Sequence, residues 1–420
     1  MLISARPSPT QLRRLTQADV ELICAKHDRL WTSRPGGARA VFAWMDLSGL
    51  DLSGKNLCDA DMTGVILADC NMRGVRLDHA NLFGADMQNA NLRDASLRRA
   101  DLRGACLRGA DLTGADLFEA DLREGAIALP DREKGLRVLE AMPRAGEVQG
   151  AVLAGANLER SRLSGVVATK ADFTDAVMKD AKLIRANLKQ ANMTGVNFAG
   201  ADLSGADLAG ANLTDAVLVG AKTVAWNVSQ ADLTGVLTDA PAGTSVEELP
   251  YKTMIREHAR WCETGGAEGK PSVFDGADLR ALESIRGFDL TALSAKGATF
   301  YGLDMGGVQL QGAHLENADL RACNLRRADL RGARLVGAKL AGADLREAQM
   351  GPLLIAADRV LPCNLSGANL KNADLARADL RQAVLAGADL SRANFSGALL
   401  KLVDVTGARR HGARGLEGVI

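Results

Sequence analysis

Few residues in this chain are of types that carry out chemistry. It has five histidines, at positions 27, 79, 258, 314 and 411. Aspartate is abundant, but its spacing follows an internal repeat, so a pair of cooperating carboxylates would be accidental. The sequence contains neither a G-x-S-x-G motif nor a phosphate-binding loop. It therefore predicts no catalytic residues, no cofactor and no enzymatic activity.

Two histidines have a tryptophan close by in the sequence, His27 with Trp31 and His258 with Trp261. One interpretation is that both pairs lie on helices that cover the open end of a repeat column, with the tryptophan filling the mouth of the core. The alternative is a docking site for a ligand or a partner. No second histidine or carboxylate lies at ligand spacing, so no metal site is predicted.

The first pair lies in a helix expected between Thr16 and Arg34. Thr16 and Asp19 have the spacing of a capping box. One face of this helix would carry Val20, Ile23, His27, Leu30 and Trp31. The second pair lies in the segment 250–274, where a helix is again followed by two glycines and then by repeats. This parallel indicates an internal duplication.

Both helices precede a long series of five-residue repeats, and the fold of these repeats must determine where the helices lie. From Leu47 every fifth residue is apolar as far as Ile127, and from Ala80 to Ala120 every fifth residue is alanine. This period fits neither an α-helix nor a flat strand. A chain that bends by about a right angle in each unit would close a square coil, and stacked coils would pair at about 4.8 Å. Leucine and alanine would point inward, and the frequent glycine would occupy a corner with positive φ.

The unit A-[D/N]-L-x-G, as in ADLRGACLRGADLTGADL, resembles that of the pentapeptide repeat family. The resemblance implies an all-β solenoid, a right-handed quadrilateral β-helix with short α-helical caps and inserts. We expect an N-terminal segment with a capping helix (1–40), a first solenoid (41–240) with an insert (128–147), and a linker with a second capping helix (241–271). A second solenoid (272–411), irregular at 351–362, and a tail (412–420) follow. The insert is expected to form a one- or two-turn helix or an Ω loop, and residues 351–362 irregular coils or a bulging loop.

Basic and acidic residues balance at 51 each. Many arginines share a unit with aspartate, as in Asp101/Arg103, Asp319/Arg321 and Asp329/Arg331. Such pairs should neutralise each other on a solvated surface. Direct binding of nucleic acid is therefore not expected. The seven cysteines show no metal or disulfide spacing, and three of them take the small inward position (Cys70, Cys323 and Cys363).

The function expected from these features is a non-enzymatic scaffold that binds an unidentified protein partner. The alternative is a DNA-mimicking regulator or protector of DNA gyrase or topoisomerase, an activity that the resemblance implies for some family members. An end-to-end homodimer is a further expectation, because Leu400, Leu402 and Val405 would lie near an open coil edge. Neither a signal peptide nor a membrane span is expected, so the predicted location is the cytoplasm.

Overall fold

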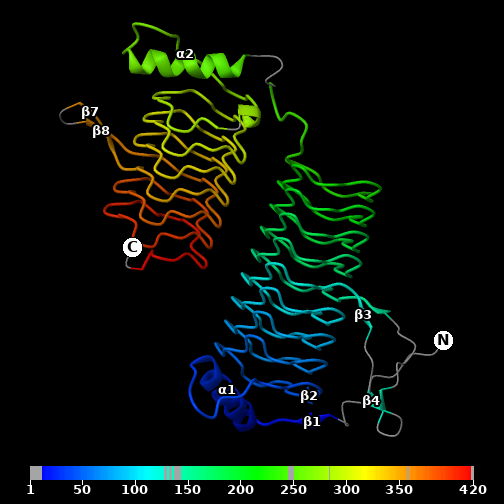
Figure 1. Cartoon of the computed structure of the whole chain (residues 1–420). Coiled ribbons are helices and arrows are strands. Elements are labelled where there is room, and N and C mark those ends of the chain that lie inside the picture. Colours follow the sequence, from blue (N-terminus) through cyan, green and yellow to red (C-terminus); the bar gives the residue numbers. More distant parts are fainter. Residues whose placement is uncertain are drawn as a thin grey trace. The chain divides into compact units, whose positions relative to one another are not determined.

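The computed structural model describes residues 12–126, 130–131, 135–136, 143–244, 250–282, 284–356 and 359–417. The chain divides into two compact units, Met1–Asp239 and Ala240–Ile420. Each unit is a stack of short coils with one helix near its N-terminal end (Figure 1). Among the described residues, no helix is long and apolar enough to cross a membrane.

Successive coils pair through single-residue parallel bridges. In the first unit Asp61 pairs with Asn81, and Asn81 pairs with Asp101, so the partners lie twenty residues apart. Four such bridges occur in each coil, five residues apart. Each bridge is held by backbone hydrogen bonds in both directions: the Leu82 amide donates to the Asp101 carbonyl at 2.8 Å, and the Asp101 amide donates to the Ala80 carbonyl at 3.0 Å. The fold is therefore a β-helix with four parallel ladders.

The repeated leucines form the core of each unit. Those between Leu47 and Leu122 are at most 1% exposed, as are the alanines from Ala80 to Ala120. The second unit has its own cluster of buried side chains, which includes Leu290, Phe300 and Leu345. The predicted inward register is confirmed along both columns except in their last coils, where Leu233 is exposed and Leu400 is partly buried. Ile127, the last residue of the first series, lies outside the described residues.

Each five-residue repeat bends at a turn. The Ala105 amide donates to the Leu102 carbonyl at 3.0 Å, and Gly104 between them has φ +66°. This confirms the corner role of the fifth position, since glycine adopts positive φ without a steric penalty. Some corners lack glycine, such as Arg99 (φ 55°) and Glu119 (φ 57°), and they place charged side chains on the column edge.

The first unit is interrupted by an insert that leaves the column intact. Its described part consists of two antiparallel strand pairs, β3 (Gly125–Ala126) with β6 (Pro143–Arg144) and β4 (Pro130–Asp131) with β5 (Gly135–Leu136). Most of the segment expected to form a short helix or an Ω loop, 128–129, 132–134 and 137–142, lies outside the described residues, so that expectation stays a prediction. Glu147, placed in the insert by the sequence analysis, already pairs with Cys106 and Val167.

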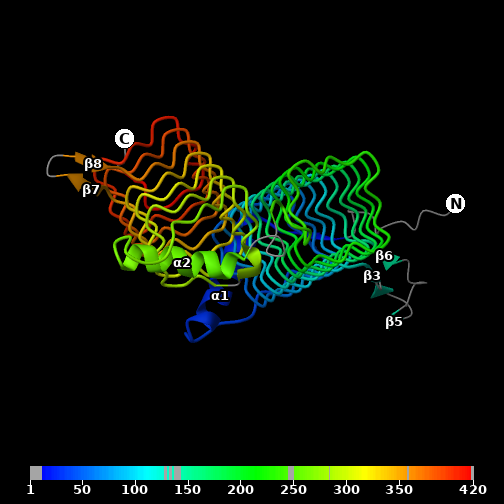
Figure 2. The same ribbon diagram turned by 90° about the horizontal axis from the view of Figure 1, so that it is seen from above.

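The second unit has a similar interruption. Strands β7 (Leu353–Ala356) and β8 (Arg359–Leu361) pair antiparallel and project from the column (Figures 1 and 2). The ladder resumes at once, with Arg334 paired to Asn364. In the segment 351–362, for which irregular coils or a bulging loop are expected, the described residues form this β-hairpin. The last bridge joins Asn394 to Arg414, so the ladder enters the expected tail.

Helix α1 (Gln17–Trp31) precedes the first coils and begins with the expected capping box, formed by Thr16 and Asp19. Just before it, β1 (Arg13–Arg14) runs parallel to β2 (Met45–Asp46) of the first coil. The Leu15 amide continues this pairing by donating to the Asp46 carbonyl at 2.9 Å. The chain therefore lays an additional strand on the edge of its first coil.

Helix α2 (Tyr251–Glu263) lies across the first coils of the second unit (Figure 2). A short 3-10 helix, η2 (Arg280–Leu282), follows in the first coil. Thr244, expected in a linker, pairs with Ala277 and so belongs to this coil. The Tyr251 hydroxyl donates to the Thr244 carbonyl at 2.7 Å, which ties α2 to the same strand.

We predict that Leu102→Asp destabilises the first unit by about 3 kcal/mol or more, because a carboxylate would be buried without a partner. Leu102 is 0% exposed. Lys179→Asp, at an exposed position, is the matched control and should leave the free energy of unfolding almost unchanged. Urea unfolding of both variants measures this, and equal stability of Leu102→Asp and wild type would contradict the register.

Candidate functional site

His27 lies at the interface between α1 and the first coils. Val20, Cys24 and His27 are the buried residues of the helix, and His27 is 0% exposed. Its Nδ1 accepts a hydrogen bond from the Ala40 amide at 3.0 Å. An acceptor at Nδ1 requires a neutral ring that carries its proton on Nε2. His27 thus fixes the chain where it enters the first coil.

His258 has the same arrangement on α2. Its Nδ1 accepts from the Ser272 amide at 3.0 Å, and its Nε2 lies 3.1 Å from the Thr291 carbonyl, which it faces as a donor. Both histidines therefore bind a backbone amide of the strand that leads into the repeats. This shared geometry supports the duplication inferred from the sequence.

The tryptophans do not fill the core, which corrects one expectation. Trp31 is 47% exposed, and Trp261 is partly exposed. The buried stripe of α1 runs through Val20, Cys24 and His27 at helical spacing, and Trp31 comes one turn too late to reach the coil. Each indole instead packs on its histidine, with ring centroids 6.4 Å apart in the first pair and 5.7 Å in the second. Both tryptophans remain available to a partner, so their docking role stays a prediction.

Side chains of α1 also bind the backbone of the first coil. The Gln17 amide group donates to the Asp51 carbonyl at 2.8 Å and accepts from the Asp51 amide at 3.0 Å. Lys55 of the coil pairs with Glu21 of the helix at 2.6 Å. A first coil has no preceding coil to satisfy these backbone groups, and the helix supplies the partners.

Several outward arginines pair with the aspartate of their own five-residue repeat, and others pair with an acidic residue of a neighbouring coil, as Arg98 does with Asp116. In Asp101/Arg103 the Nε and an Nη atom of the guanidinium donate to the two carboxylate oxygens at 2.9 and 2.7 Å. The predicted pairs Asp319/Arg321 and Asp329/Arg331 have the same bidentate geometry. Arg321 is only 7% exposed, however, so the expectation of a fully solvated surface is wrong there. The bidentate hydrogen bonds with Asp319 offset part of the cost of removing this guanidinium from water.

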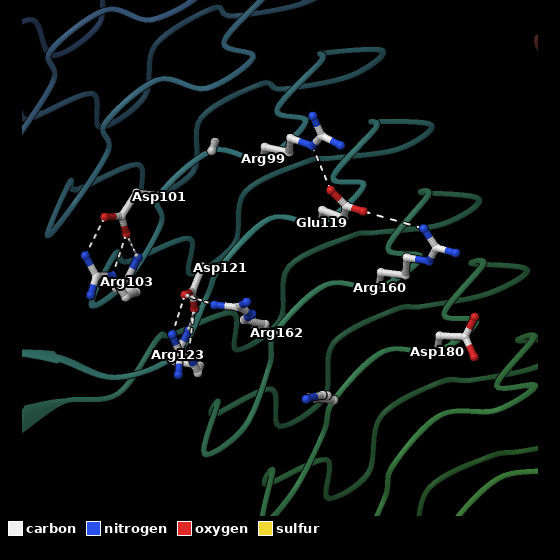
Figure 3. Close-up of a pocket in the computed structure, with 11 residues that line it drawn as sticks. Arg99, Asp101, Arg103, Glu119, Asp121, Arg123, Arg160, Arg162 and Asp180 are labelled. Atoms are coloured by element: carbon white, nitrogen blue, oxygen red, sulfur yellow. Dashed lines mark hydrogen bonds and ion pairs between the residues drawn. The ribbon is translucent and has the colours of Figure 1, made fainter.

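A broad depression of about 640 Å³ lies on one side of the first unit (Figure 3). Its charged lining comprises six basic residues (Arg99, Arg103, Arg123, Arg160, Arg162 and Lys182) and four acidic residues (Asp101, Glu119, Asp121 and Asp180). Arg99 and Arg160 both approach Glu119, at 2.7 and 3.6 Å. A second depression, of about 480 Å³, shares Arg103 and Arg123 and adds Arg185 and Glu124. This clustering is not visible in the sequence, because it depends on which coils the insert brings together.

The buried cysteines behave as small apolar residues. Burial raises the pKa of the Cys70 thiol to about 11 and that of Cys363 to about 12. The Cys70 thiol donates to the Leu47 carbonyl at 2.9 Å. Such thiols stay protonated and unreactive at neutral pH. Within the described ranges, no group of three or more histidine, cysteine, aspartate or glutamate side chains is placed to hold a metal ion.

The last coil of each unit is less covered than the rest. In the first unit Leu233, at a core position, is 41% exposed. At the C-terminal end Leu402 is 72% exposed, but Val405 is 5% exposed and Leu416 is buried beside the same core. The expected end-to-end homodimer through Leu400, Leu402 and Val405 therefore remains a prediction, with a smaller exposed apolar surface than the sequence suggests.

Comparison with known proteins identifies the repeat. The family described as Pentapeptide repeats matches eight copies, over residues 40–78, 76–114, 149–183, 181–220, 309–350 and 363–401. These matches cover more than half of the chain, so the chain belongs to the pentapeptide repeat family, whose fold is a right-handed β-helix. A comparison with curated proteins gave no match.

Several solved structures are similar. QnrB1, a plasmid-mediated fluoroquinolone resistance protein, is 17% identical over 46% of this chain and 94% of its own, with a TM-score of 0.29. Rfr23 from the cyanobacterium Cyanothece 51142 is 26% identical over 33% and 88%, with a TM-score of 0.21. HetL from Nostoc sp. strain PCC 7120, involved in regulating heterocyst differentiation, is 20% identical over 94% and 96%, with a TM-score of 0.14. At these TM-scores the superpositions are partial, and they assign no function to this chain.

We predict that acid loosens both helices. Burial lowers the pKa of His27 and of His258 below the usual value. The unfolded state then binds more protons, so stability should fall as the pH drops through about 6.5 toward the lowered values in the folded protein. Thermal melting between pH 7.5 and 5.5 should show a larger loss of Tm for wild type than for His27→Gln/His258→Gln, which cannot titrate there.

His411→Gln, at an exposed histidine, is the control and should keep the wild-type pH dependence. Identical pH profiles for wild type and the double variant would show that these histidines do not couple helix docking to protonation.

Proposed function

We propose that this pentapeptide repeat protein is a non-enzymatic scaffold that binds a protein partner, with the β7–β8 hairpin as one contact element. On that hairpin Leu354 is 66% exposed, Ile355 43% and Val360 47%. Large apolar side chains gathered on a projecting element are typical of protein interaction sites. This cluster is the observation that carries the proposal.

The hairpin is firmly attached to its column. Leu353 and Leu361 at its base face Gly332, and a Cβ atom at this glycine would lie 2.9 Å from the Leu353 Cβ. The base of the hairpin is thus in contact with the coil, while the side chains of Leu354 and Ile355 are exposed. A preorganised apolar element loses little conformational entropy when a partner binds.

We further infer that each unit is a four-sided column, and that α1 and α2 cap the two columns. Four bridges in every twenty residues support the quadrilateral cross-section. The contacts of Gln17 and His27 with the first coil, and those of Tyr251 and His258 in the second unit, support the capping role. The chain would then carry two tandem solenoids, from about residue 41 and from about residue 272, and operate in the cytoplasm.

A non-enzymatic role agrees with the state of the polar side chains. Several of the aspartates that repeat along the columns are held by the arginine of the same five-residue repeat, as in Asp344/Arg346 and Asp379/Arg381. These arginines keep the pKa of Asp344 and of Asp379 below the usual value. A carboxylate so held is a poor general base, because catalysis requires a pKa near the working pH.

The alternative, a DNA-mimicking regulator or protector of gyrase or topoisomerase, would require continuous anionic rows. On this chain bidentate arginines neutralise many of the outward aspartates. We therefore expect the purified protein to leave gyrase supercoiling and its inhibition by a fluoroquinolone nearly unchanged. Inhibition or drug protection at sub-micromolar concentration would favour the alternative over a scaffold of another kind.

The scaffold proposal predicts that Leu354→Asp/Ile355→Asp abolishes partner binding without unfolding the protein. Tagged full-length chain is purified from its source cells, and the proteins that copurify are quantified by mass spectrometry. The partner enriched by wild type should fall at least about tenfold with the variant, which corresponds to about 1.4 kcal/mol of binding free energy.

Val224→Asp/Val273→Asp is the matched control, since Val224 is 73% and Val273 61% exposed elsewhere. It should retain the partner, and both variants should keep the wild-type Tm. Equal recovery with wild type and the hairpin variant would exclude the hairpin as the contact, and no specific partner at all would overturn the scaffold proposal.

A further inference from the structure

We propose that the depression on the first unit is a docking site for an acidic segment of a protein partner. The inference rests on the proposed function, because it names a surface and a partner chemistry for the scaffold. The site is defined here as the two adjoining depressions between Arg99 and Arg185. Together their lining holds seven basic and five acidic residues.

The insert creates this site. Asp101, Asp121, Arg162 and Lys182 follow one another along a single ladder, with Asp121 bridged directly to Arg162. The ladder position that carries aspartate in the two coils before the insert therefore carries a basic residue in the two coils after it, before aspartate returns at Asp202. Coils are about 4.8 Å apart, so the change of sign places Arg162 and Lys182 beside the paired arginines of the preceding coils.

Three of the five acidic residues of the site, Asp101, Glu119 and Asp121, already pair with arginines. Asp121 is bound by both Nε and Nη2 of Arg123, at 2.9 and 2.7 Å. Arg162 approaches the same carboxylate only to 3.6 Å, beyond hydrogen-bond distance. Glu119 is likewise shared by Arg99 and Arg160. Guanidinium donors therefore remain available to an incoming anion, since each group has five.

Lys182 and Arg185 extend this positive surface toward solvent. Both are exposed, and within the described part of the chain neither has a side-chain ion pair with an acidic residue. Asp180 and Glu124, the acidic residues of the lining not yet considered, form no ion pair within the same described ranges. Basic residues nevertheless outnumber acidic residues in the site, seven to five, although the net charge of the chain is zero. A local positive field of this kind attracts acidic partners and is screened by salt.

Carboxylates suit this site better than nucleic acid. Its lining contains no aromatic residue on which a base could stack. Two phenylalanines that contact arginines in this part of the column are already covered: the Arg103 guanidinium lies 5.4 Å from the ring centre of Phe83, and that of Arg98 lies 4.6 Å from the ring centre of Phe118. Paired donors on several guanidinium groups match the two oxygens of aspartate and glutamate side chains.

The insert stem borders the site. A Cβ atom at Gly125 of β3 would lie 2.9 Å from the Phe83 ring and 3.0 Å from the Arg103 backbone. The insert thus leaves the column against the residues that line the depression. A bound segment would pass beside this stem, which limits the directions from which it can enter.

The test uses a fluorescein-labelled dodecapeptide of alternating glutamate and glycine as probe, with anisotropy measured on the full chain at 50 mM and 300 mM salt. Binding should be detectable at low salt and weaken at least about threefold at high salt. In Arg162→Gln/Lys182→Gln/Arg185→Gln the affinity should fall at least about tenfold.

The matched control is Arg73→Gln/Arg76→Gln/Lys170→Gln, which removes the same charges from exposed positions outside the site. It should change the affinity less than about twofold. Equal losses in the two variants, or no binding of the peptide by wild type, would overturn the proposal. Tighter binding of a single-stranded oligonucleotide of equal charge would assign the site to nucleic acid instead.

Copurification separates this proposal from the scaffold function. If the partner recovered with wild type is lost from the site variant and kept by the control, both are supported. If the partner stays with the site variant, the docking site is wrong and the scaffold stands. If wild type recovers no partner but still binds the peptide in the expected way, the scaffold proposal fails alone.

Discussion

The structure depends on one constraint, the return of an apolar side chain to the inside of the coil every five residues. Leu102 and Ala100 of one unit are buried, and the next unit repeats them with Leu107 and Ala105. The interior of the coil therefore has room for one large and one small side chain from each five-residue repeat. The same turn aligns the backbone with the coil twenty residues later, so burial of the core and formation of the ladders cannot be separated. A change that expels a leucine would also break backbone hydrogen bonds on both sides of its coil.

This constraint also determines where the column can carry additional structure. The separation between bridged residues increases from twenty to 41 across the first insert, at Cys106 and Glu147, and to thirty across the hairpin, at Arg334 and Asn364. In both cases the added residues leave the column and return to the position at which the register resumes. The inserts and the outward positions are thus free to vary without changing the core. The β7–β8 hairpin and the basic depression are both consequences of that freedom, since one projects from the column and the other arises where the insert changes which charges become neighbours.

The sequence was sufficient to predict the parts of the structure that repeat. The register of Leu102, the positive φ of Gly104 and the capping box of Thr16 all follow from local chemistry that one unit or one helix end contains. Properties that depend on contacts between residues far apart in the sequence could not be predicted in this way. The exposure of Trp31 depends on how far α1 reaches across the first coil, and the burial of Arg321 depends on its neighbours one coil away. Glu147 could not be assigned to a ladder without knowing that the insert returns before it. The basic depression was missed for the same reason, since Asp121 and Arg162 become neighbours only after folding.

Amide hydrogen exchange, resolved to single residues, tests the central claim that the ladders run unbroken past the inserts. The Leu107 amide donates to the Glu147 carbonyl at 2.6 Å, and the Leu335 amide donates to the Asn364 carbonyl at 2.7 Å. Both bonds join coils on opposite sides of an interruption. If the columns are continuous, these two amides should exchange as slowly as that of Leu82, which lies within an uninterrupted stretch. Fast exchange at Leu107 or Leu335, with slow exchange at Leu82, would show that the column breaks at its inserts and would contradict the account.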